Sequence, residues 1–220
     1  MTLKNKLYNE FVAGQTLTDW VLIASGLLLQ IITFVITGDS LLSLTTGMLG
    51  VFSVTLCSQR KVSSFLFGVF QIGCYMVLSA REHLWGELVE NGFYMITTIL
   101  GALAWSRNYD SSEEGNSVQA RRLTPKGWLV TLLSFLVGTV GGYALLRQTS
   151  DPNPLLDTIS SVPAFVAQIL MMLRYREQWI FWIVVDVIKV VLWVIQGDWC
   201  MAAQFAFWTV VCFYGLKKWK

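Results

Sequence analysis

The chain has 220 residues, of which 55% are hydrophobic and 14% charged, and its formal net charge is +2. A soluble domain carries about a quarter charged residues, so this composition indicates an integral membrane protein. The small net charge gives no reason to expect a nucleic-acid partner. The four cysteines lack the spacing of a disulfide framework or a zinc site.

Eight apolar stretches are each long enough to cross a bilayer as a helix, which takes about 20 residues. Short segments of alternating polarity, which are typical of a transmembrane barrel, do not occur. The first stretch lacks a small-residue cleavage site, so we do not expect it to be a cleaved signal peptide. We therefore predict an all-α integral membrane protein with eight transmembrane helices. The stretches are 20–37, 41–57, 62–80, 84–105, 128–146, 155–173, 179–196 and 199–216.

Lys and Arg are distributed unevenly between the two sides that eight spans define. If both termini are cytoplasmic, only Arg81 and Arg147 lie on the outer side, and Lys189 lies within a span. All other Lys and Arg residues then fall on the cytoplasmic side, as expected for a multi-pass membrane protein. We therefore predict cytoplasmic N- and C-termini.

A polar segment, residues 108–127, separates two halves that resemble each other. A shift of 114 positions superimposes residues 41–106 on 155–220 without a gap. Each half would contain three spans, and a displacement by four spans gives both halves the same direction across the membrane. The residues that coincide include Arg60 with Arg174, Phe67 with Phe181, Trp85 with Trp199, and Gly101 with Gly215.

These observations predict a 3+1+3 parallel-repeat core preceded by one extra N-terminal helix. Internal repeats of this kind are characteristic of secondary transporters, whose substrate sites lie near the middle of the membrane. The predicted parts are an N-terminal tail with the extra helix (1–40), a first three-helix repeat (41–107), a cytoplasmic linker with an inverting connector helix (108–154), and a second three-helix repeat (155–220).

One face of the seventh span combines aromatic, charged and amide side chains. At 100° per residue, six such residues share a face about 100° wide. Charges at this depth cost ~2.5–3.5 kcal/mol each and usually mark a functional cavity. The alternatives are an interfacial belt for the tryptophans and a mutual ion pair for the two charges. The six residues, here called the polar stripe, are Trp179, Trp182, Asp186, Lys189, Trp193 and Gln196.

Polar residues in other spans extend the candidate site, although each alone is more often an interhelical hydrogen bond. Indole faces stack on flat rings and attract cations, and amides and carboxylates bond hydroxyls and carboxamides. A small aromatic and hydroxylated solute, including a cationic one, fits this set. Pro163 is a candidate hinge or a static kink. The additional candidates are Gln71, Glu90, Asn91, Tyr94, Gln168, Gln204 and Trp208.

Catalysis is not expected. The chain has no GxSxG, HExxH, P-loop or dinucleotide motif. We predict no cofactor and no metal site, because carboxylates are few and the single histidine, His83, falls in an outer loop.

The segments QWIFWIVVDV and LWVIQG, within a 3+1+3 repeat, resemble the PnuC family of bacterial vitamin transporters, whose best-known substrate is nicotinamide riboside. The resemblance extends from about residue 41 to the end, and its most specific element is the pair Trp179 and Trp182. It implies a full-length relative of the SWEET sugar transporters, located in the bacterial inner membrane and assembled as a homotrimer. It also implies facilitated diffusion by alternating access, with the vitamin trapped by cytoplasmic phosphorylation for NAD biosynthesis.

The chain departs from the family pattern at two positions of the stripe. Asp186 occupies a position where the family carries Asn, and Lys189 replaces a small residue. Asp186 is therefore expected to meet either a cationic substrate or Lys189. On this basis Trp182 would stack on the base, while Asp186, Gln196 and Gln71 would bond the ribose or the amide.

Three alternatives stay open at this point. The cargo could be another vitamin, such as thiamine or riboflavin. A membrane scaffold or sensor would not need the polar stripe, and a membrane-embedded enzyme would convert its ligand chemically.

Overall fold

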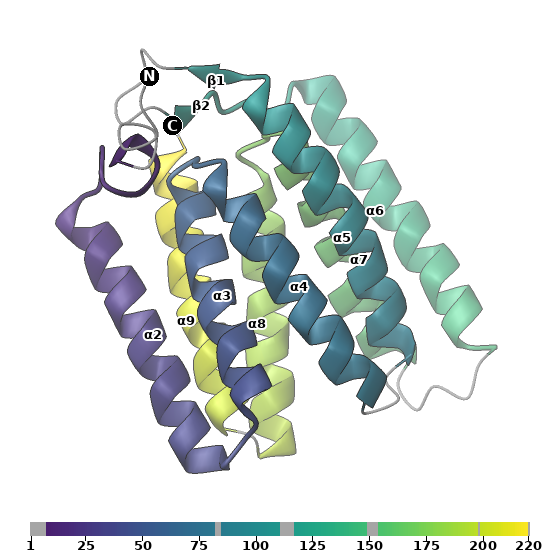
Figure 1. Ribbon diagram of the computed structural model, residues 1–220. Helices are drawn as coiled ribbons and strands as arrows, with labels where there is room; N and C mark the ends of the chain where they lie inside the picture. The colour runs from purple at the N-terminus through teal and green to yellow at the C-terminus, as the bar shows by residue number, and fades with distance from the viewer. Residues whose placement is uncertain (1–7, 82–84, 111–116, 149–153, 198, 220) are drawn as a thin grey trace. The chain divides into compact units, whose positions relative to one another are not determined.

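The computed structural model describes residues 8–81, 85–110, 117–148, 154–197 and 199–219. In this part of the chain, eight helices of 18–22 residues coincide with the eight predicted spans (Figure 1). The helices are α2 (Leu17–Thr37), α3 (Leu41–Ser58), α4 (Ser63–Arg81), α5 (Trp85–Ser106), α6 (Pro125–Leu146), α7 (Pro154–Met172), α8 (Gln178–Gln196) and α9 (Trp199–Lys218). A two-stranded antiparallel hairpin, β1 (Tyr109–Asp110) with β2 (Ser117–Val118), follows α5.

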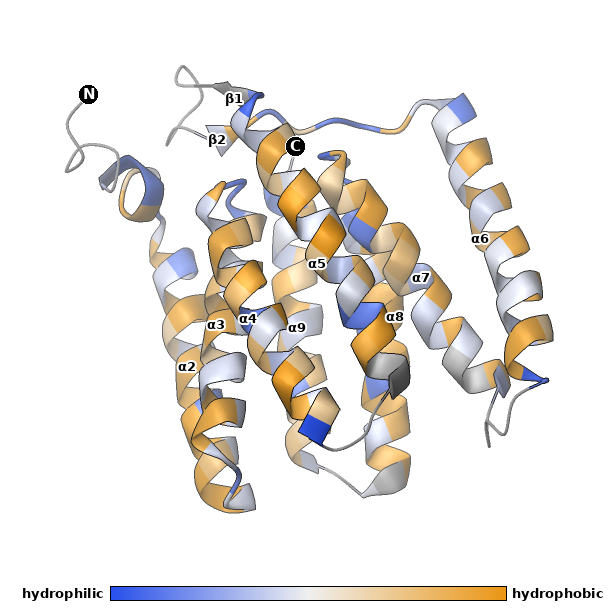
Figure 2. Cartoon of the chain, turned by 45° about the vertical axis from the view of Figure 1, so that its right-hand side comes forward, coloured by the Kyte–Doolittle hydropathy of each residue, from blue (hydrophilic) through white to orange (hydrophobic). Residues whose placement is uncertain are grey.

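Six of these helices are long and apolar enough to cross a membrane by their own composition, as judged on the described residues. They are α2, α3, α4, α6, α8 and α9. In α7 the apolar part is shorter, Thr158–Met172. Figure 2 shows orange, hydrophobic residues along most of the helices, with blue residues mainly in connections and at helix ends. The predicted all-α membrane architecture is therefore confirmed.

Helix boundaries follow from local capping chemistry. Thr16 and Asp19 form a capping box at the start of α2, and Thr124 caps α6, whose first residue is Pro125. Gly38 and Gly197 end α2 and α8 in the left-handed conformation, with φ of 64° and 78°. The sequence thus sets both ends of α2.

The chain divides into two compact units, which are described separately. The first comprises residues 1–120 together with Lys217–Trp219. In it, α3 packs against α2 and α4, and α4 packs against α5. The interior is closed by Phe65 and Trp105, whose rings meet edge to face at 4.8 Å. A Cβ atom on Gly101 would lie 2.5 Å from the Phe65 ring, so only glycine permits this contact.

The second unit comprises residues 121–216. In it, α7 packs against α6 and α8, around a cluster formed by Ala167, Leu170 and Phe181. The indole of Trp179 is buried, and a Cβ atom on Gly215 would lie 2.5 Å from it. The two units thus share one contact: a glycine of α5 or α9 packs against an aromatic ring near the start of the preceding helix, α4 or α8.

The turns between α3 and α4 and between α7 and α8 share an unusual backbone. Arg60 and Arg174 are the only non-glycine residues with positive φ in the described ranges, at 61° and 66°. Their N–H groups donate to Cys57 O and Met171 O, both at 2.9 Å. Left-handed conformations are uncommon for residues with a side chain. The two turns are therefore built in the same way, 114 positions apart.

Candidate functional site

The polar stripe lies on α8, within the second unit, and its members differ in burial. Trp179 is 2% exposed and packs on Gly215, so its ring fills the interior. Trp182 is half-buried and packs against the cluster around Phe181. The Nε1 atom of Trp193 is shielded from solvent and has no hydrogen-bond partner among the described residues. Trp182 and Trp193 are both less buried than Trp179.

Asp186 contacts a residue of α9 and not Lys189, which lies three residues later on α8. Asp186 is 5% exposed, and its Oδ2 accepts a hydrogen bond from the Cys212 thiol of α9 at 3.4 Å. Within the described ranges, no ion pair joins Asp186 to Lys189, which is half-buried. The i,i+3 ion pair that sequence spacing allows is thus not formed. Gln196 lies in the last turn of α8, and its side chain falls outside the described part of the structure.

Cys212 was not among the residues that the sequence singled out. It lies four residues after Trp208 and eight after Gln204, so the three share one face of α9. Gln204 and Trp208 are both half-buried. This spacing is the signal that could have identified Cys212.

Two further candidates of the second unit lie on α7. Gln168 is buried, at 4% exposure. Pro163 is also buried, and α7 is helical on both sides of it. The role of Pro163 as a hinge stays a prediction.

The candidates of the first unit lie on α4 and α5. The Tyr94 hydroxyl donates to Glu90 Oε1 at 2.5 Å, one turn away on the same helix. Asn91 is buried, at 6% exposure, and Gln71 on α4 is half-buried. The Glu90–Tyr94 bond is a local i,i+4 contact, and its role in binding stays a prediction. In the residues that the structure describes, no group of three or more His, Cys, Asp or Glu side chains could hold a metal ion.

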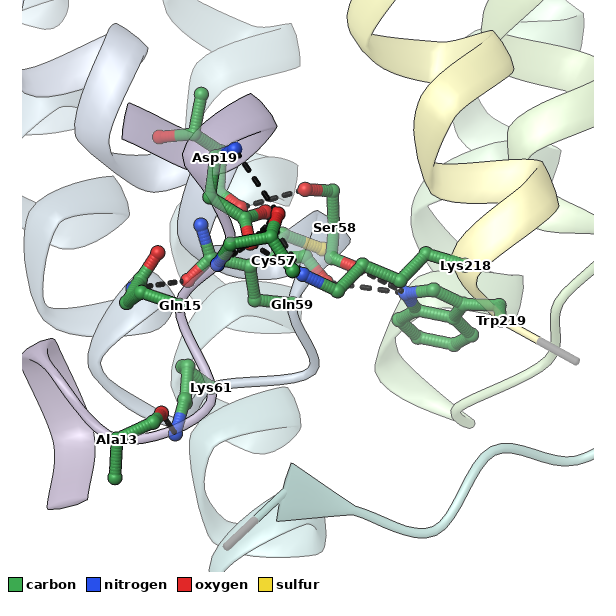
Figure 3. A network of polar contacts seen from close by, with 11 residues as sticks. Ala13, Gln15, Asp19, Cys57, Ser58, Gln59, Lys61, Lys218 and Trp219 are labelled. Atoms are coloured by element: carbon green, nitrogen blue, oxygen red, sulfur yellow. Dashed lines mark hydrogen bonds and ion pairs between the residues drawn. The ribbon is translucent and has the colours of Figure 1, made fainter. Parts of the chain in front are cut away.

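A second polar network, in the first unit, was not predicted at all (Figure 3). The Asp19 side chain is fully buried and is bound by Lys218 Nζ at 2.7 and 2.8 Å. The neighbouring Trp219 indole donates to the backbone oxygens of Cys57 and Ser58, at 3.2 and 3.1 Å. We call the contacts of Lys218 and Trp219 the C-terminal clamp. It fixes the end of the chain to α2 and α3.

A second cation, Lys61, reinforces the same region. Lys61 is buried, and its Nζ donates to Asn9 O at 2.6 Å and Ala13 O at 3.2 Å. Burial lowers the pKa of Lys61, because desolvation disfavours the ammonium form, while nearby Glu10 partly opposes the shift. Glu10 itself accepts the Ser63 N–H at 2.6 Å. The residues before α2 are thus attached to the α3–α4 turn.

Comparison with known proteins places these helices in a family. The family model described as "Nicotinamide mononucleotide transporter" matches residues 40–220. The nicotinamide riboside transporter PnuC of Haemophilus influenzae is 34% identical over 194 residues, covering 88% of this chain and 86% of the relative. The PnuC protein of Neisseria mucosa is 33% identical over 179 residues, covering 80% of this chain and 67% of the relative.

A solved structure agrees with this assignment. The crystal structure of the vitamin B3 transporter PnuC superimposes with a TM-score of 0.85 at 28% sequence identity, covering 100% of this chain and 97% of that chain. The resemblance predicted from the Trp179–Trp182 segment is confirmed, and kinship with the SWEET transporters stays a prediction. The chain belongs to the PnuC family of nicotinamide riboside transporters, a family of membrane transporters and not of enzymes.

Proposed function

We propose that this protein takes up nicotinamide riboside across the bacterial inner membrane. The observation that carries the proposal is the match over residues 40–220 to a family whose relatives with 33–34% identity are named nicotinamide riboside transporters. The eight helices and their apolar surfaces support a multi-pass membrane protein.

The polar stripe is compatible with the pyridinium ring of nicotinamide riboside. No ion pair with Lys189 offsets the charge of Asp186 in the described structure, so a cationic ring next to Asp186 would be attracted. Nicotinamide riboside carries such a pyridinium cation. A half-buried indole such as Trp182 provides a stacking surface for the ring.

The predicted site residues complete the proposal. Trp182 stacks on the pyridine ring, and Asp186 faces its charge. Lys189, Trp193 and Gln196 extend the same face toward the ribose, while Trp179 supports the stripe from its contact with Gly215. Supporting roles are assigned to Gln71, Glu90, Asn91, Tyr94, Gln168, Gln204 and Trp208 as predicted from the sequence.

The architecture we propose is eight spans in a 3+1+3 parallel repeat with α2 as the extra helix. Two matched features support it: the left-handed turns at Arg60 and Arg174, and the glycine–aromatic contacts Gly101–Phe65 and Gly215–Trp179. Facilitated diffusion by alternating access, trapping by phosphorylation, cytoplasmic termini and a trimeric assembly belong to the same proposal.

The test is uptake of labelled nicotinamide riboside into proteoliposomes that contain the purified protein. We expect saturable entry down the substrate gradient that excess unlabelled riboside inhibits. Trp182→Ala should reduce it by about tenfold or more, because the stacking surface is lost. Trp208→Phe, which keeps an aromatic ring, should have a smaller effect.

Competition separates the cargo alternatives. Thiamine and riboflavin, added in excess, should inhibit uptake of the labelled riboside only weakly. Unlabelled nicotinamide riboside, or a nicotinamide analogue that keeps the pyridinium and carries no phosphate, should inhibit it more strongly. Absence of riboside entry, with or without a proton or sodium gradient, would show that this substrate is wrong. Recovery of the solute in a chemically changed form would instead indicate an enzyme.

A further inference from the structure

Among the residues that the structure describes, a thiol and no ammonium group contacts the carboxyl group of Asp186. Cys212 Sγ donates to Oδ2 at 3.4 Å, and the two residues are 5% and 3% exposed. Among the described residues, no second hydrogen bond or ion pair reaches this carboxyl. A thiol is a weak and neutral donor, so it orients one oxygen without supplying an opposite charge.

We propose that Asp186, positioned by Cys212, is the counter-charge by which this transporter selects an N-alkylpyridinium cation over neutral ligands of the same shape. The inference rests on the proposed function and specifies which part of the substrate the site recognises, namely the charged ring. Asp186 is then a specificity-determining residue, and Cys212 is a positioning residue.

The cost of a charge in a membrane span argues for a cationic ligand. An ionised carboxylate within a span is expensive unless an opposite charge lies beside it. The obvious intramolecular partner, Lys189, forms no ion pair with it in the described structure. A pyridinium ring is an aromatic cation without N–H donors, so a nearby carboxylate can compensate its charge without needing a directed hydrogen bond.

The aromatic neighbour reinforces the same choice. Trp182 lies four residues before Asp186, which places the two side chains on one face of α8, one turn apart. An indole attracts a cation placed over its ring and also stacks on a flat ring. A pyridinium ion satisfies the indole and the carboxylate together, whereas a neutral ring engages only the indole.

Cys212 contributes by fixing the direction of the carboxyl group. It lies on the face of α9 that also carries Gln204 and Trp208. Replacing the thiol with a methyl group frees the carboxyl to rotate, so binding should weaken while the maximal rate changes little. A serine restores the donor, so Cys212→Ser should recover the affinity that Cys212→Ala loses.

The experiment compares two substrates that differ in charge at the ring. Nicotinamide riboside is a cation, and its reduced form, dihydronicotinamide riboside, is neutral and carries the same ribose and carboxamide. We expect the protein to prefer the cation in proteoliposome uptake, measured as Vmax/KM. Asp186→Asn, which keeps the size of the side chain, should lower this preference by at least about tenfold.

The thiol is tested in the same assay. Cys212→Ala should raise KM for the cation about three- to tenfold with little change in Vmax, and Cys212→Ser should restore it. Cys57 is a buried cysteine of the first unit, at 5% exposure, so Cys57→Ala is the matched control and should leave the preference unchanged.

Each result has a defined meaning. Equal uptake of both forms by the unmodified protein would overturn the inference without any variant, even if Asp186→Asn fails to fold. A folded Asp186→Asn protein that keeps the preference would overturn it as well. A purely structural role for Cys212 would lower Vmax and protein yield instead of KM. Failure of the unmodified protein to take up either form would refute the proposed function itself.

Discussion

Lys218 Nζ lies 2.7 Å from Oδ2 of Asp19, so the last turn of α9 neutralises a fully buried carboxylate in the first turn of α2. Asp19 also accepts hydrogen bonds from the backbone N–H and the hydroxyl of Thr16, at 2.8 and 2.7 Å. The carboxylate therefore both caps α2 and anchors the end of the chain. The pair thus attaches α2 to the end of α9 within the first unit.

The two partners of this ion pair should respond differently to mutation. Lys218→Met leaves Asp19 buried without its cation and should destabilise the protein by about 3 kcal/mol. Asp19→Asn keeps most of the capping bonds and leaves Lys218 partly exposed, so its effect should be smaller. Thermal unfolding in detergent, followed by size-exclusion fluorescence, measures the order of the melting temperatures.

The double variant is the control for this interpretation. Asp19→Asn combined with Lys218→Met removes both charges, so it should be more stable than Lys218→Met alone. If the double variant is the less stable of the two, the penalty does not come from an uncompensated carboxylate.

The Trp219 indole should contribute through both its ring and its N–H group. Trp219→Phe keeps an aromatic ring but leaves the carbonyl groups of Cys57 and Ser58 without this donor, at a cost of about 1 kcal/mol. Trp219→Ala also creates a cavity next to Trp105, so it should cost about 3–5 kcal/mol. Equal melting temperatures for the two variants would contradict this division of roles.

The two glycine–aromatic contacts predict that an alanine at either glycine lowers the stability of the protein. Gly101→Ala and Gly215→Ala each place a methyl group 2.5 Å from a ring atom, of Phe65 and Trp179 respectively. Overpacking of this kind costs about 1–3 kcal/mol. Gly92→Ala in α5 is the control, since nothing lies within 4 Å of its added carbon, and it should not lower the melting temperature.

Arg60 and Arg174 adopt a left-handed backbone conformation, so both positions should tolerate replacement by glycine. Arg60→Gly and Arg174→Gly fit the observed φ of 61° and 66° without strain. Arg60→Val and Arg174→Val place a β-branched side chain there and should each cost about 1–2 kcal/mol. The melting temperatures of the four variants provide the measurement, and a valine at either position that is as stable as glycine would show that the turn conformation is wrong.

The sequence was sufficient for the helices because their length and polarity are local properties. Helix α8 begins one residue before its predicted start, and α3 and α4 agree as closely. Helix α2 begins at Leu17, three residues early, because the capping residues Thr16 and Asp19 are polar and lie outside the apolar stretch. Apolar content marks the membrane-spanning part of a helix, while capping chemistry sets where the helix starts.

The contacts between helices could not be predicted from the sequence. The i,i+3 spacing of Asp186 and Lys189 suggested an ion pair, yet Asp186 contacts Cys212, which is 26 positions away. Asp19 and Lys218 are 199 positions apart, and no local pattern connects them. A charged side chain has several partners within reach once helices pack, so periodicity identifies the face on which it lies but not the atom it meets.

The separation of Asp19 from Lys218 also orders events during synthesis. At about 5–20 residues per second, the ribosome needs roughly 10–40 s to add the intervening chain. Throughout that interval the newly made α2 carries a carboxylate whose ammonium partner does not yet exist. Helix α2 therefore reaches its final environment only after α9 has been made. Products truncated before Lys218 lack that partner, so their Asp19 stays without its cation.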